Sequence, residues 1–406
     1  MNLFKGFYVQ RHIHIDDVYM NFQHTQIDIQ LLQQRAYNLR WAAVPKDVIP
    51  LTAADPDFKC PPMVRAAIEN YTKGGYFSYA PAEGLSQFKE AVHQFLKSKR
   101  NYLVDPAHIL PVDSAAFGIY LVCKTMLNPN DEAIIFDPVD FLFQYAIENI
   151  GAKAIRFPIP PSTQTVDFSF LEQLITPKTK LICLCNPLNP TGKVFKRSEL
   201  EQLGKIALKH NIIILSDEIW SDIVFKPHVF TSIGSLSDSI SNQVVTVSGF
   251  SKSYGLAGLR IGFIATSNKA LFESIFAHSL HQSTIHGANS LGQIAAAAAL
   301  NEAQDWLAEF VDHLQQMRDL ITARINTIPV LKTLPPEGCY VSFIDITQTG
   351  MSAEQFHLKM LEQAKVAVVP GLSKWFGRGA EGYIRISFAT SAELLTESIN
   401  RIERNL

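Results

Sequence analysis

The sequence predicts an α/β fold, with a large domain built on a mostly parallel sheet and a smaller α+β domain after it. Two observations predict this fold. Short runs of isoleucine, valine and leucine recur between residues 133 and 266, and helical patterns lie between most of them. From about residue 291 the pattern becomes that of a long helix, a short strand, another helix and a final strand–helix unit. Continuous apolar strands that alternate with helices are typical of a parallel sheet covered on both faces.

The individual elements follow from these runs in order. Strands are predicted at 133–136, 154–159, 180–185, 212–215, 244–247 and 261–266. Residues 197–210 carry apolar side chains at three- and four-residue spacing, which predicts a helix. In the second domain, the predicted strands are 338–346 and 383–390.

These elements divide the chain into three parts. Residues 1–50 are polar and aromatic, and we expect them to pack with the small domain. Residues 51–290 form the predicted large domain, and residues 291–406 form the predicted small domain.

Composition excludes several classes of protein. The formal net charge of −2 gives no positive surface for nucleic acid or an anionic membrane. The chain shows no signal-peptide pattern, and its longest apolar run, IAAAAAL near residue 294, is too short to span a bilayer. The five cysteines lack the spacing of a zinc site and suit a reducing compartment, so no metal is expected. We expect a cytoplasmic protein with no nucleic-acid or membrane partner.

Three predicted strands are followed by polar motifs. The motif NPLNPTG spans 186–192, SDEIW spans 216–220, and SGFSK spans 248–252. Loop ends are normally polar, so any one of them is unremarkable alone. Ligands of open α/β sheets bind beyond the carboxyl ends of the strands. An amide, a carboxylate and a lysine delivered to one edge of the sheet therefore indicate a site.

The chemistry of the carboxylate and the lysine points to one cofactor. Asp217 follows four isoleucine and leucine residues, so it should be buried and needs a cationic or hydrogen-bonded partner. Lys252 lies among glycines and aromatics, a setting in which an amine can act as a nucleophile. A Schiff-base lysine with an aspartate for a pyridinium nitrogen is the arrangement that pyridoxal 5′-phosphate (PLP) requires.

The same region can also bind the phosphate of this cofactor. Ser248 and Ser251 supply hydroxyl groups, and Arg260 supplies a guanidinium. A helix predicted to begin near Ser114 and Ala115 adds free backbone amides, which suit an anion. Ser114 could equally be only a helix cap.

Taken together, NPLNPTG, SDEIW and SGFSKSYGLAGLRIGF resemble aminotransferase class I/II, a family of PLP-dependent enzymes of fold type I. The resemblance covers residues 50–390 and implies a seven-stranded sheet. It implies that Lys252 forms the Schiff base and that Asp217 keeps the pyridine nitrogen protonated. It also implies that Asn186 bonds the phenolic oxygen of the cofactor and contacts substrate, and that Arg260 binds the phosphate.

Two further positions match the family. Arg385, in YIRISFA, resembles the arginine that binds the substrate α-carboxylate, although pairing with Glu381 or Glu397 would also explain it. Tyr79, in YAPAEGL, resembles a tyrosine that reaches the phosphate of the neighbouring subunit. The resemblance therefore implies a homodimer with shared sites, although Tyr79 alone could be a packing aromatic.

Three positions depart from the family pattern. Trp220 stands where a tyrosine usually donates to the cofactor oxygen, and its indole N–H could replace that donor. Asp140 stands where an aromatic ring usually stacks on the cofactor, which leaves Phe141 or Phe117 to stack. Ala54, on the substrate side, replaces a usual glycine.

The predicted function is a PLP-dependent transaminase of amino-acid metabolism, acting on an amino acid and a 2-oxo acid. No arginine lies between Arg260 and Arg318, where relatives specific for dicarboxylates place one, which argues against aspartate or glutamate. The alternative is a carbon–sulfur β-lyase, because residues 40–58 resemble the cystathionine β-lyase-like branch. A non-catalytic PLP-binding regulator is a remote alternative, because residues 1–50 show no helix-turn-helix pattern. A nicotinamide enzyme is disfavoured because no GxGxxG follows a strand.

Overall fold

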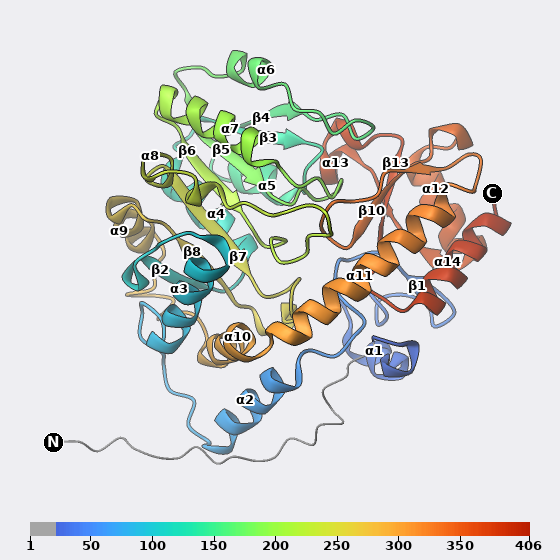
Figure 1. Ribbon diagram of the computed structural model, residues 1–406, viewed down its shortest axis with the longest axis horizontal. Helices are drawn as coiled ribbons and strands as arrows, with labels where there is room; N and C mark the ends of the chain where they lie inside the picture. Colours follow the sequence, from blue (N-terminus) through green and yellow to red (C-terminus); the bar gives the residue numbers. More distant parts are fainter. Residues whose placement is uncertain (1–21) are drawn as a thin grey trace.

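The computed structural model describes residues 22–406 and contains a central seven-stranded sheet (Figure 1). In spatial order its strands are β2 (Ile109–Val112), β8 (Gly262–Ala265), β7 (Val244–Gly249), β6 (Ile213–Asp217), β5 (Thr179–Cys185), β3 (Glu132–Asp137) and β4 (Lys153–Pro158). All neighbours pair in parallel except β8, which runs antiparallel to both β2 and β7. The predicted mostly parallel α/β architecture is confirmed.

The helices that carry the layers have the following bounds. They are α1 (Ile29–Arg35), α2 (Pro62–Lys73), α3 (Ser86–Arg100), α4 (Ala115–Met126), α5 (Leu142–Glu148), α6 (Phe168–Gln173), α7 (Arg197–His210), α8 (Asp238–Ser241), α9 (Lys269–His278), α10 (Ser290–Glu302), α11 (Gln304–Ile325), α12 (Ala353–Lys359), α13 (Ser373–Phe376) and α14 (Ala392–Arg404). In the described part of the chain, no helix is both long and apolar enough to cross a membrane.

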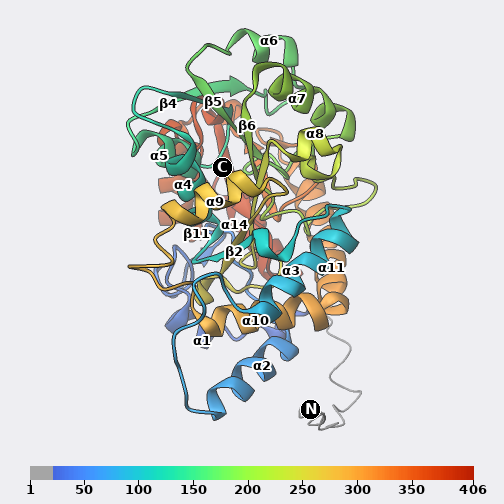
Figure 2. The ribbon, with the colours of Figure 1, turned by 90° about the vertical axis from the view of Figure 1, so that its left-hand side faces the viewer.

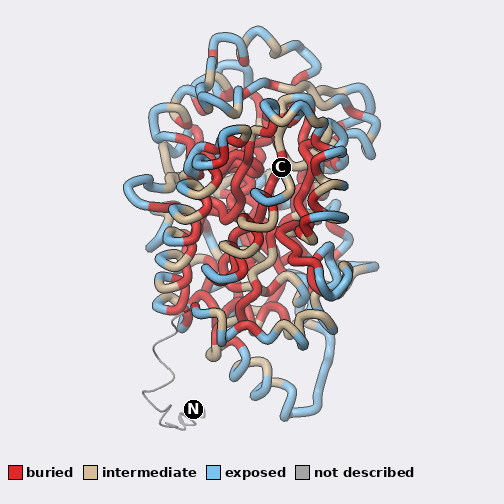
Figure 3. Tube along the Cα trace, turned by 90° about the vertical axis from the view of Figure 1, so that its right-hand side faces the viewer, coloured by how far each residue is buried: buried red, intermediate tan, exposed pale blue. Residues whose placement is uncertain are grey.

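The direction of the connections places helices on both faces of the large sheet. The step from β3 to β4 and the step from β5 to β6 run in opposite directions across the sheet. Because such crossovers are right-handed, their helices α5 and α7 cover opposite faces. The core strands between them are almost wholly buried, and Figure 3 shows the buried trace running through the interior. The strand order reverses between β3 and β5, so the carboxyl ends there open a crevice for a ligand.

The six strands predicted between residues 133 and 266 are all present in the large sheet, and the helix predicted at 197–210 is α7. Strand β2 has no counterpart among the predicted strands, because its four residues include Pro111 and give only a short apolar run. The predicted long helix after residue 291 is two helices, α10 and α11, that meet at Ala303. Helix α10 packs against α2 and α3 (Figure 2), whereas α11 packs against α14.

The C-terminal part holds a four-stranded antiparallel sheet, in the order β12 (Val369–Pro370), β13 (Tyr383–Ser387), β10 (Val341–Asp345) and β9 (Lys332–Thr333). Strand β1 (Ile49–Pro50) pairs in parallel with β11 (Val366–Ala367), so the chain from Phe22 to Pro50 ends against the C-terminal part. Residues 1–21 of the predicted N-terminal segment lie outside the described residues. The division at 50 and 290 stays a prediction.

Candidate active site

The three polar motifs meet at one edge of the large sheet. Strands β5, β6 and β7 are adjacent and parallel, with Cys185 in register with Asp217, and Asp217 in register with Val247. The motifs that begin at these strand ends therefore lie side by side, next to the point at which the strand order reverses. The sequence places the amide, the carboxylate and the lysine at that edge because each strand ends where its apolar run ends.

Lys252 follows β7 and is half-buried beside the loop that contains Ala54. Its Nζ donates a hydrogen bond to the carbonyl oxygen of Ala54 at 2.6 Å and lies 5.3 Å from the centre of the Trp220 ring. Burial lowers the pKa of this amine, and the nearby Asp55 carboxylate opposes that shift. An amine with a lowered pKa is more often neutral and can then act as a nucleophile or a base.

Asp217 is buried at the end of β6, with 7% of its surface exposed. Its Oδ1 accepts a hydrogen bond from the backbone N–H of Ile219 at 3.1 Å. Burial raises the pKa of this carboxyl to about 7. Within residues 22–406, no cationic side chain lies within ion-pair distance of it. A buried carboxylate without a cation is costly, so the site suits a ligand that brings a positive charge.

The start of α4 provides an anion-binding corner beside β7 and β8. Ser114 caps the helix, and its Oγ accepts from the N–H of Phe117 at 3.1 Å. Gly262 on β8 faces this turn so closely that a Cβ there would lie 2.7 Å from Ala115 N and 2.7 Å from the carbonyl oxygen of Ser248. The first backbone N–H groups of a helix lack partners within the helix and attract anions. Glycine at 262 thus lets the helix start approach the sheet.

The other predicted phosphate residues are placed differently from one another. The Oγ of Ser248 donates to the carbonyl oxygen of Glu218 at 3.2 Å, and Ser251 is half-buried in the following turn. Arg260 is exposed in the left-handed backbone region, at φ 49°, and its Nη1 donates to Ala257 O at 3.4 Å. Its guanidinium therefore keeps donors that could meet an anion.

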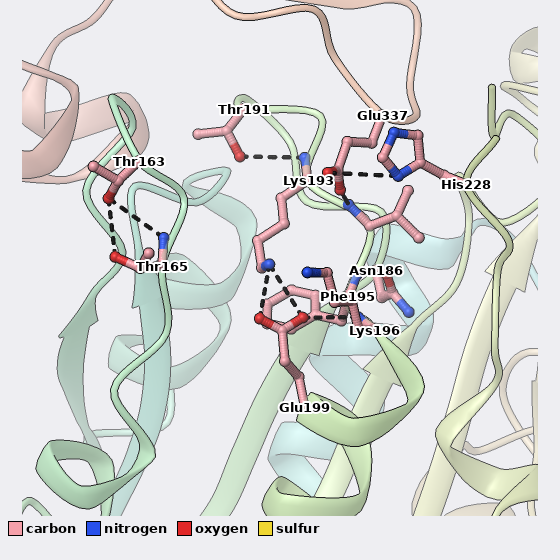
Figure 4. A network of polar contacts seen from close by, with 11 residues as sticks. Thr163, Thr165, Asn186, Thr191, Lys193, Phe195, Lys196, Glu199, His228 and Glu337 are labelled. Carbon is pink, nitrogen blue, oxygen red and sulfur yellow. Dashed lines mark hydrogen bonds and ion pairs between the residues drawn. The ribbon is translucent and has the colours of Figure 1, made fainter. Parts of the chain in front are cut away.

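Asn186 has both ends of its side-chain amide engaged by the protein. Its Oδ1 accepts from the N–H of Phe195 at 3.1 Å, and its Nδ2 donates to Thr231 O at 3.4 Å. Figure 4 shows Asn186 beside Phe195, in a region that also contains the ion pair of Lys193 and Glu199. These contacts favour a role for Asn186 in holding the loop, not the cofactor and substrate contact expected from the sequence.

Asn189, three residues later in the same motif, lies at the predicted carboxylate site instead. Its Oδ1 accepts from Arg385 Nη1 at 3.0 Å, and its Nδ2 donates to Asp140 Oδ2 at 2.9 Å. The sequence offers two Asn-Pro pairs in NPLNPTG, and only the three-dimensional structure distinguishes them.

Arg385 is buried on β13, with 7% of its surface exposed. Besides the bond to Asn189, its Nη2 donates to Thr52 O at 3.3 Å, and its guanidinium carbon lies 5.2 Å from the centre of the Phe376 ring. Burial lowers the pKa of this guanidinium, while Asp140 opposes the shift. Its Nε is buried and has no hydrogen-bond partner among the described residues, which suits a bound carboxylate.

Neither glutamate considered as a partner from the sequence pairs with Arg385. Glu397 accepts a hydrogen bond from Arg401 one helical turn later, and no ion pair joins Glu381 to Arg385. The hydrogen-bond partners of Arg385 are Asn189 and Thr52, which lie in loops far from it in the sequence, so the local sequence around YIRISFA does not indicate them.

Asp140 lies in the loop after β3 and points into this cluster. Its Oδ1 accepts from the N–H of Leu142 at 3.3 Å, and its Oδ2 accepts from Asn189. Burial raises the pKa of this carboxyl, and the charge of Arg385 opposes that shift. The position at which an aromatic ring is usual therefore holds a carboxyl group that is linked through Asn189 to Arg385, the predicted carboxylate-binding arginine.

The aromatic residues near the site divide into buried and exposed ones. Trp220 is buried and meets Tyr340 edge-on, with ring centres 4.7 Å apart. Phe141 is 44% exposed at the start of α5, which does not favour the stacking role expected for it. Phe117 on α4 packs beside Tyr120, with ring centres 6.4 Å apart.

Tyr79 lies on the surface, in an aromatic groove, and not among the side chains that contact Lys252. It is 85% exposed, and its ring centre is 5.2 Å from that of His286. The groove has a volume of about 540 Å³ and includes Tyr71, Phe77, Tyr79, Ile285, His286 and Leu291. An exposed aromatic groove of this kind is typical of an interaction surface.

Sequence reasoning missed two further residues at the lysine. The hydroxyl of Tyr340 donates to Ala54 O at 3.1 Å, the same oxygen that accepts from Lys252. Asp55 follows in the same loop, and burial raises its pKa while Lys252 lowers it. Both come from segments far from Lys252 in the sequence, so no local motif identified them.

The residues of this edge fit PLP. Among the described residues Asp217 is a buried carboxylate without an ion-pair partner, which suits a pyridinium nitrogen, and Lys252 is the adjacent amine. The start of α4, with Gly262 against it, offers amides to a phosphate.

The model of the family described as "Aminotransferase class I and II" matches residues 46–402. The chain belongs to this family. An aspartate aminotransferase of Pyrococcus abyssi is 32% identical over 369 residues, which is 90% of this chain and 93% of that protein. A cystathionine beta-lyase PatB of Bacillus subtilis is 28% identical over 364 residues, covering 89% and 93% of the two chains.

A solved structure of a PLP-bound putative aminotransferase from Clostridium difficile 630 superposes with a TM-score of 0.83. It is 26% identical to this chain and covers 93% of it and 95% of its own length. Membership of the aminotransferase family confirms the predicted PLP cofactor and the predicted class of enzyme, a PLP-dependent transaminase.

Proposed function

We propose that the protein moves an amino group between an amino acid and a 2-oxo acid, with Lys252 and Asp217 as its catalytic residues. The observation that carries this proposal is the meeting of Lys252, Asp217 and Arg385 around one crevice. When bound, PLP supplies a carbonyl carbon for the amino group and a ring that withdraws electrons from the substrate.

Each side chain then has a distinct task. Arg385, held in place by Asn189, binds the α-carboxylate, which fixes the orientation of the α-carbon. Lys252, with its lowered pKa, would act as the base that takes up the α-proton of the substrate. The carboxylate of Asp217 holds a proton on the pyridine nitrogen. The phosphate is held by the start of α4 and by the end of β7 with the chain after it, through Ser114, Ala115, Ser248, Ser251 and Arg260.

We further propose that the working unit is a homodimer in the cytoplasm with shared sites. Tyr79 and Arg260 are exposed in one copy, although the sequence assigns both to the phosphate. The aromatic groove around Tyr79 gives a surface that a second copy could cover. The cysteines are all unpaired, which suits a reducing compartment. Sedimentation velocity tests the dimer, and a monomeric active protein would contradict it.

A β-lyase is the second candidate, favoured by the relative that is a cystathionine beta-lyase and by residues 40–58. In that segment Arg40 forms a buried ion pair with Asp57, and the Trp41 Nε1 donates to the same oxygen at 2.6 Å. A half-reaction screen with single amino acids separates the candidates. A transaminase leaves pyridoxamine phosphate and a keto acid, whereas a lyase releases pyruvate and a thiol from cystathionine.

Replacing Lys252 tests the cofactor and the activity together. In Lys252→Ala we expect the yellow, borohydride-reducible chromophore to vanish and amino transfer to fall by about 10⁴-fold or more, because base and Schiff-base amine are both lost. Lys193→Ala is the control, since Lys193 pairs with Glu199 and should keep the chromophore. An unchanged chromophore in Lys252→Ala would contradict the proposal.

A further inference from the structure

Asp140, Asn189 and Arg385 form a hydrogen-bonded chain across the crevice. Arginine only donates, so Asn189 must turn its oxygen toward Arg385 and its NH₂ toward Asp140. Asp140 therefore accepts from Asn189, while its other oxygen accepts from the N–H of Leu142. The chain fixes the orientation of Asn189 and ties a carboxyl group to the guanidinium that binds substrate.

This arrangement gives Arg385 a negative neighbour before any ligand arrives. Its Nη1 and Nη2 already donate to Asn189 and Thr52, and its Nε has no partner among the described residues. A ligand carboxylate at this guanidinium would be a second anion beside Asp140 in a buried place. Two carboxylates that share one site cannot both stay ionised easily, so one of them takes up a proton.

Four titratable or charged groups face Asp140 from the surrounding elements. Arg385 on β13 is cationic, and Lys252 after β7 is cationic when it is protonated; both charges favour the ionised carboxyl. Asp217 on β6 and the Cys185 thiol on β5 would be anionic when ionised and oppose it. The bound α-carboxylate cancels the charge of Arg385, which is the largest influence that keeps Asp140 ionised.

We propose that Asp140 is a positioning residue that couples ligand binding to protonation: a substrate carboxylate binds Arg385 while Asp140 takes up one proton from solvent. The proposal rests on the proposed function, because it takes Arg385 as the carboxylate site. Protonated Asp140 keeps its carbonyl oxygen for Asn189 and gains an O–H that can donate toward the bound carboxylate. Binding is then tightest at low pH and weakens as the pH rises.

The test measures binding of 3-phenylpropanoate to the holoenzyme by calorimetry between pH 6 and 9. This probe has a carboxylate but no amino or keto group, so no turnover occurs. For the wild type we expect the Kd to rise by up to about tenfold per pH unit in the alkaline range. Asp140→Asn removes the charge and keeps one oxygen, which can accept from Asn189 but no longer also from the N–H of Leu142, so its slope should be smaller. At the alkaline end it should bind at least about tenfold tighter than the wild type.

The matched control is Asp137→Asn, three residues earlier at the end of the same strand. Asp137 is also half-buried, but it pairs with Arg156 and accepts from the N–H of Gly379. This variant should keep the slope of the wild type. Other titrating groups of the holoenzyme contribute equally to all three proteins, so the difference in slope reports Asp140.

A second variant and a second measurement keep the test decisive. Asp140→Ser, which also removes the charge, replaces Asp140→Asn if thermal unfolding shows that the latter is not folded. Proton uptake by the wild type is counted in buffers of different ionisation enthalpy, and a count of zero overturns the proposal, as do equal slopes. Absence of the yellow chromophore or of amino transfer would instead refute the proposed function.

Discussion

The two halves of the crevice differ in how far the protein alone satisfies them. On one side, the Asp217 carboxylate is buried with a single backbone donor and no cation within ion-pair distance among residues 22–406. On the other side, Arg385 is held by Asn189, by the Thr52 carbonyl and by the face of a phenylalanine ring. The first half leaves a charge for a ligand to balance, whereas the protein itself already supplies partners for the second half.

The largest effect is expected from removing the negative charge of Asp217, which in this comparison is the charge left for the cofactor. Asp217→Asn should lower kcat/KM by about 10³-fold, because a neutral amide no longer holds the proton on the cofactor ring. Steady-state kinetics with saturating cofactor measures this. A loss below tenfold would contradict the role of Asp217.

The same substitution should stabilise the protein without its cofactor. Burial raises the pKa of Asp217 in the folded protein to about 7, above its value of 3.8 in the unfolded chain. The free energy of unfolding therefore falls as the pH rises from the unfolded pKa to the folded pKa. Between pH 5.5 and 8.5 the cofactor-free protein should lose about 2 kcal/mol from this group, and Asp217→Asn should not. Glu218, whose pKa is likewise raised to about 7 by burial, adds a parallel loss in both proteins. Urea unfolding at the two pH values provides the measurement.

Replacing Arg385 by lysine keeps the positive charge but removes the planar guanidinium, and so tests whether the second half needs that geometry. Arg385→Lys should raise the KM for the amino donor by about 10²-fold, because an ammonium cannot replace the bonds to Asn189, Thr52 and a ligand together. The cofactor spectrum should stay that of the wild type. Loss of the chromophore in this variant would show that the two halves are not separable.

The smallest expected effects separate the two asparagines. Asn189→Ala should raise the KM by about tenfold, since Asn189 contacts Arg385. Asn186→Ala should leave the KM within about twofold but lower the free energy of unfolding by about 1–3 kcal/mol, because Phe195 N–H loses its acceptor. Paired kinetic and urea-unfolding measurements check both, and the opposite pattern would return the site role to Asn186.

The contrast between the halves also explains which site residues could be predicted from the sequence and which could not. Lys252 and Asp217 were predicted because each follows directly from a recognisable apolar strand, so position along the chain and position in space coincide. Asn189 was missed because two Asn-Pro pairs occur in one loop, and only the path of that loop decides which one meets Arg385. Tyr340, which shares the Ala54 oxygen with Lys252, and Asp55, whose charge acts on that amine, were missed because both come from segments distant in the sequence.

The departures from the family pattern follow the same division. Trp220 keeps an aromatic side chain beside Lys252, so the half of the crevice that contains Lys252 and Asp217 still has an aromatic ring at that position. Asp140 replaces an apolar ring by a carboxyl group, and its consequences fall on the arginine half. The sequence shows both changes, but only the contacts reveal that Asp140 is linked to Arg385 through Asn189.

The carbonyl oxygen of Ala54 accepts hydrogen bonds from both the Lys252 amine and the Tyr340 hydroxyl. Once the lysine nitrogen is engaged elsewhere, that oxygen keeps only the tyrosine. The loop around it is anchored nearby through Asp57 N–H to Ala389 O, beyond the end of β13. One backbone oxygen thus links the lysine to Tyr340, and the Asp57 bond ties the same loop to the C-terminal part of the chain.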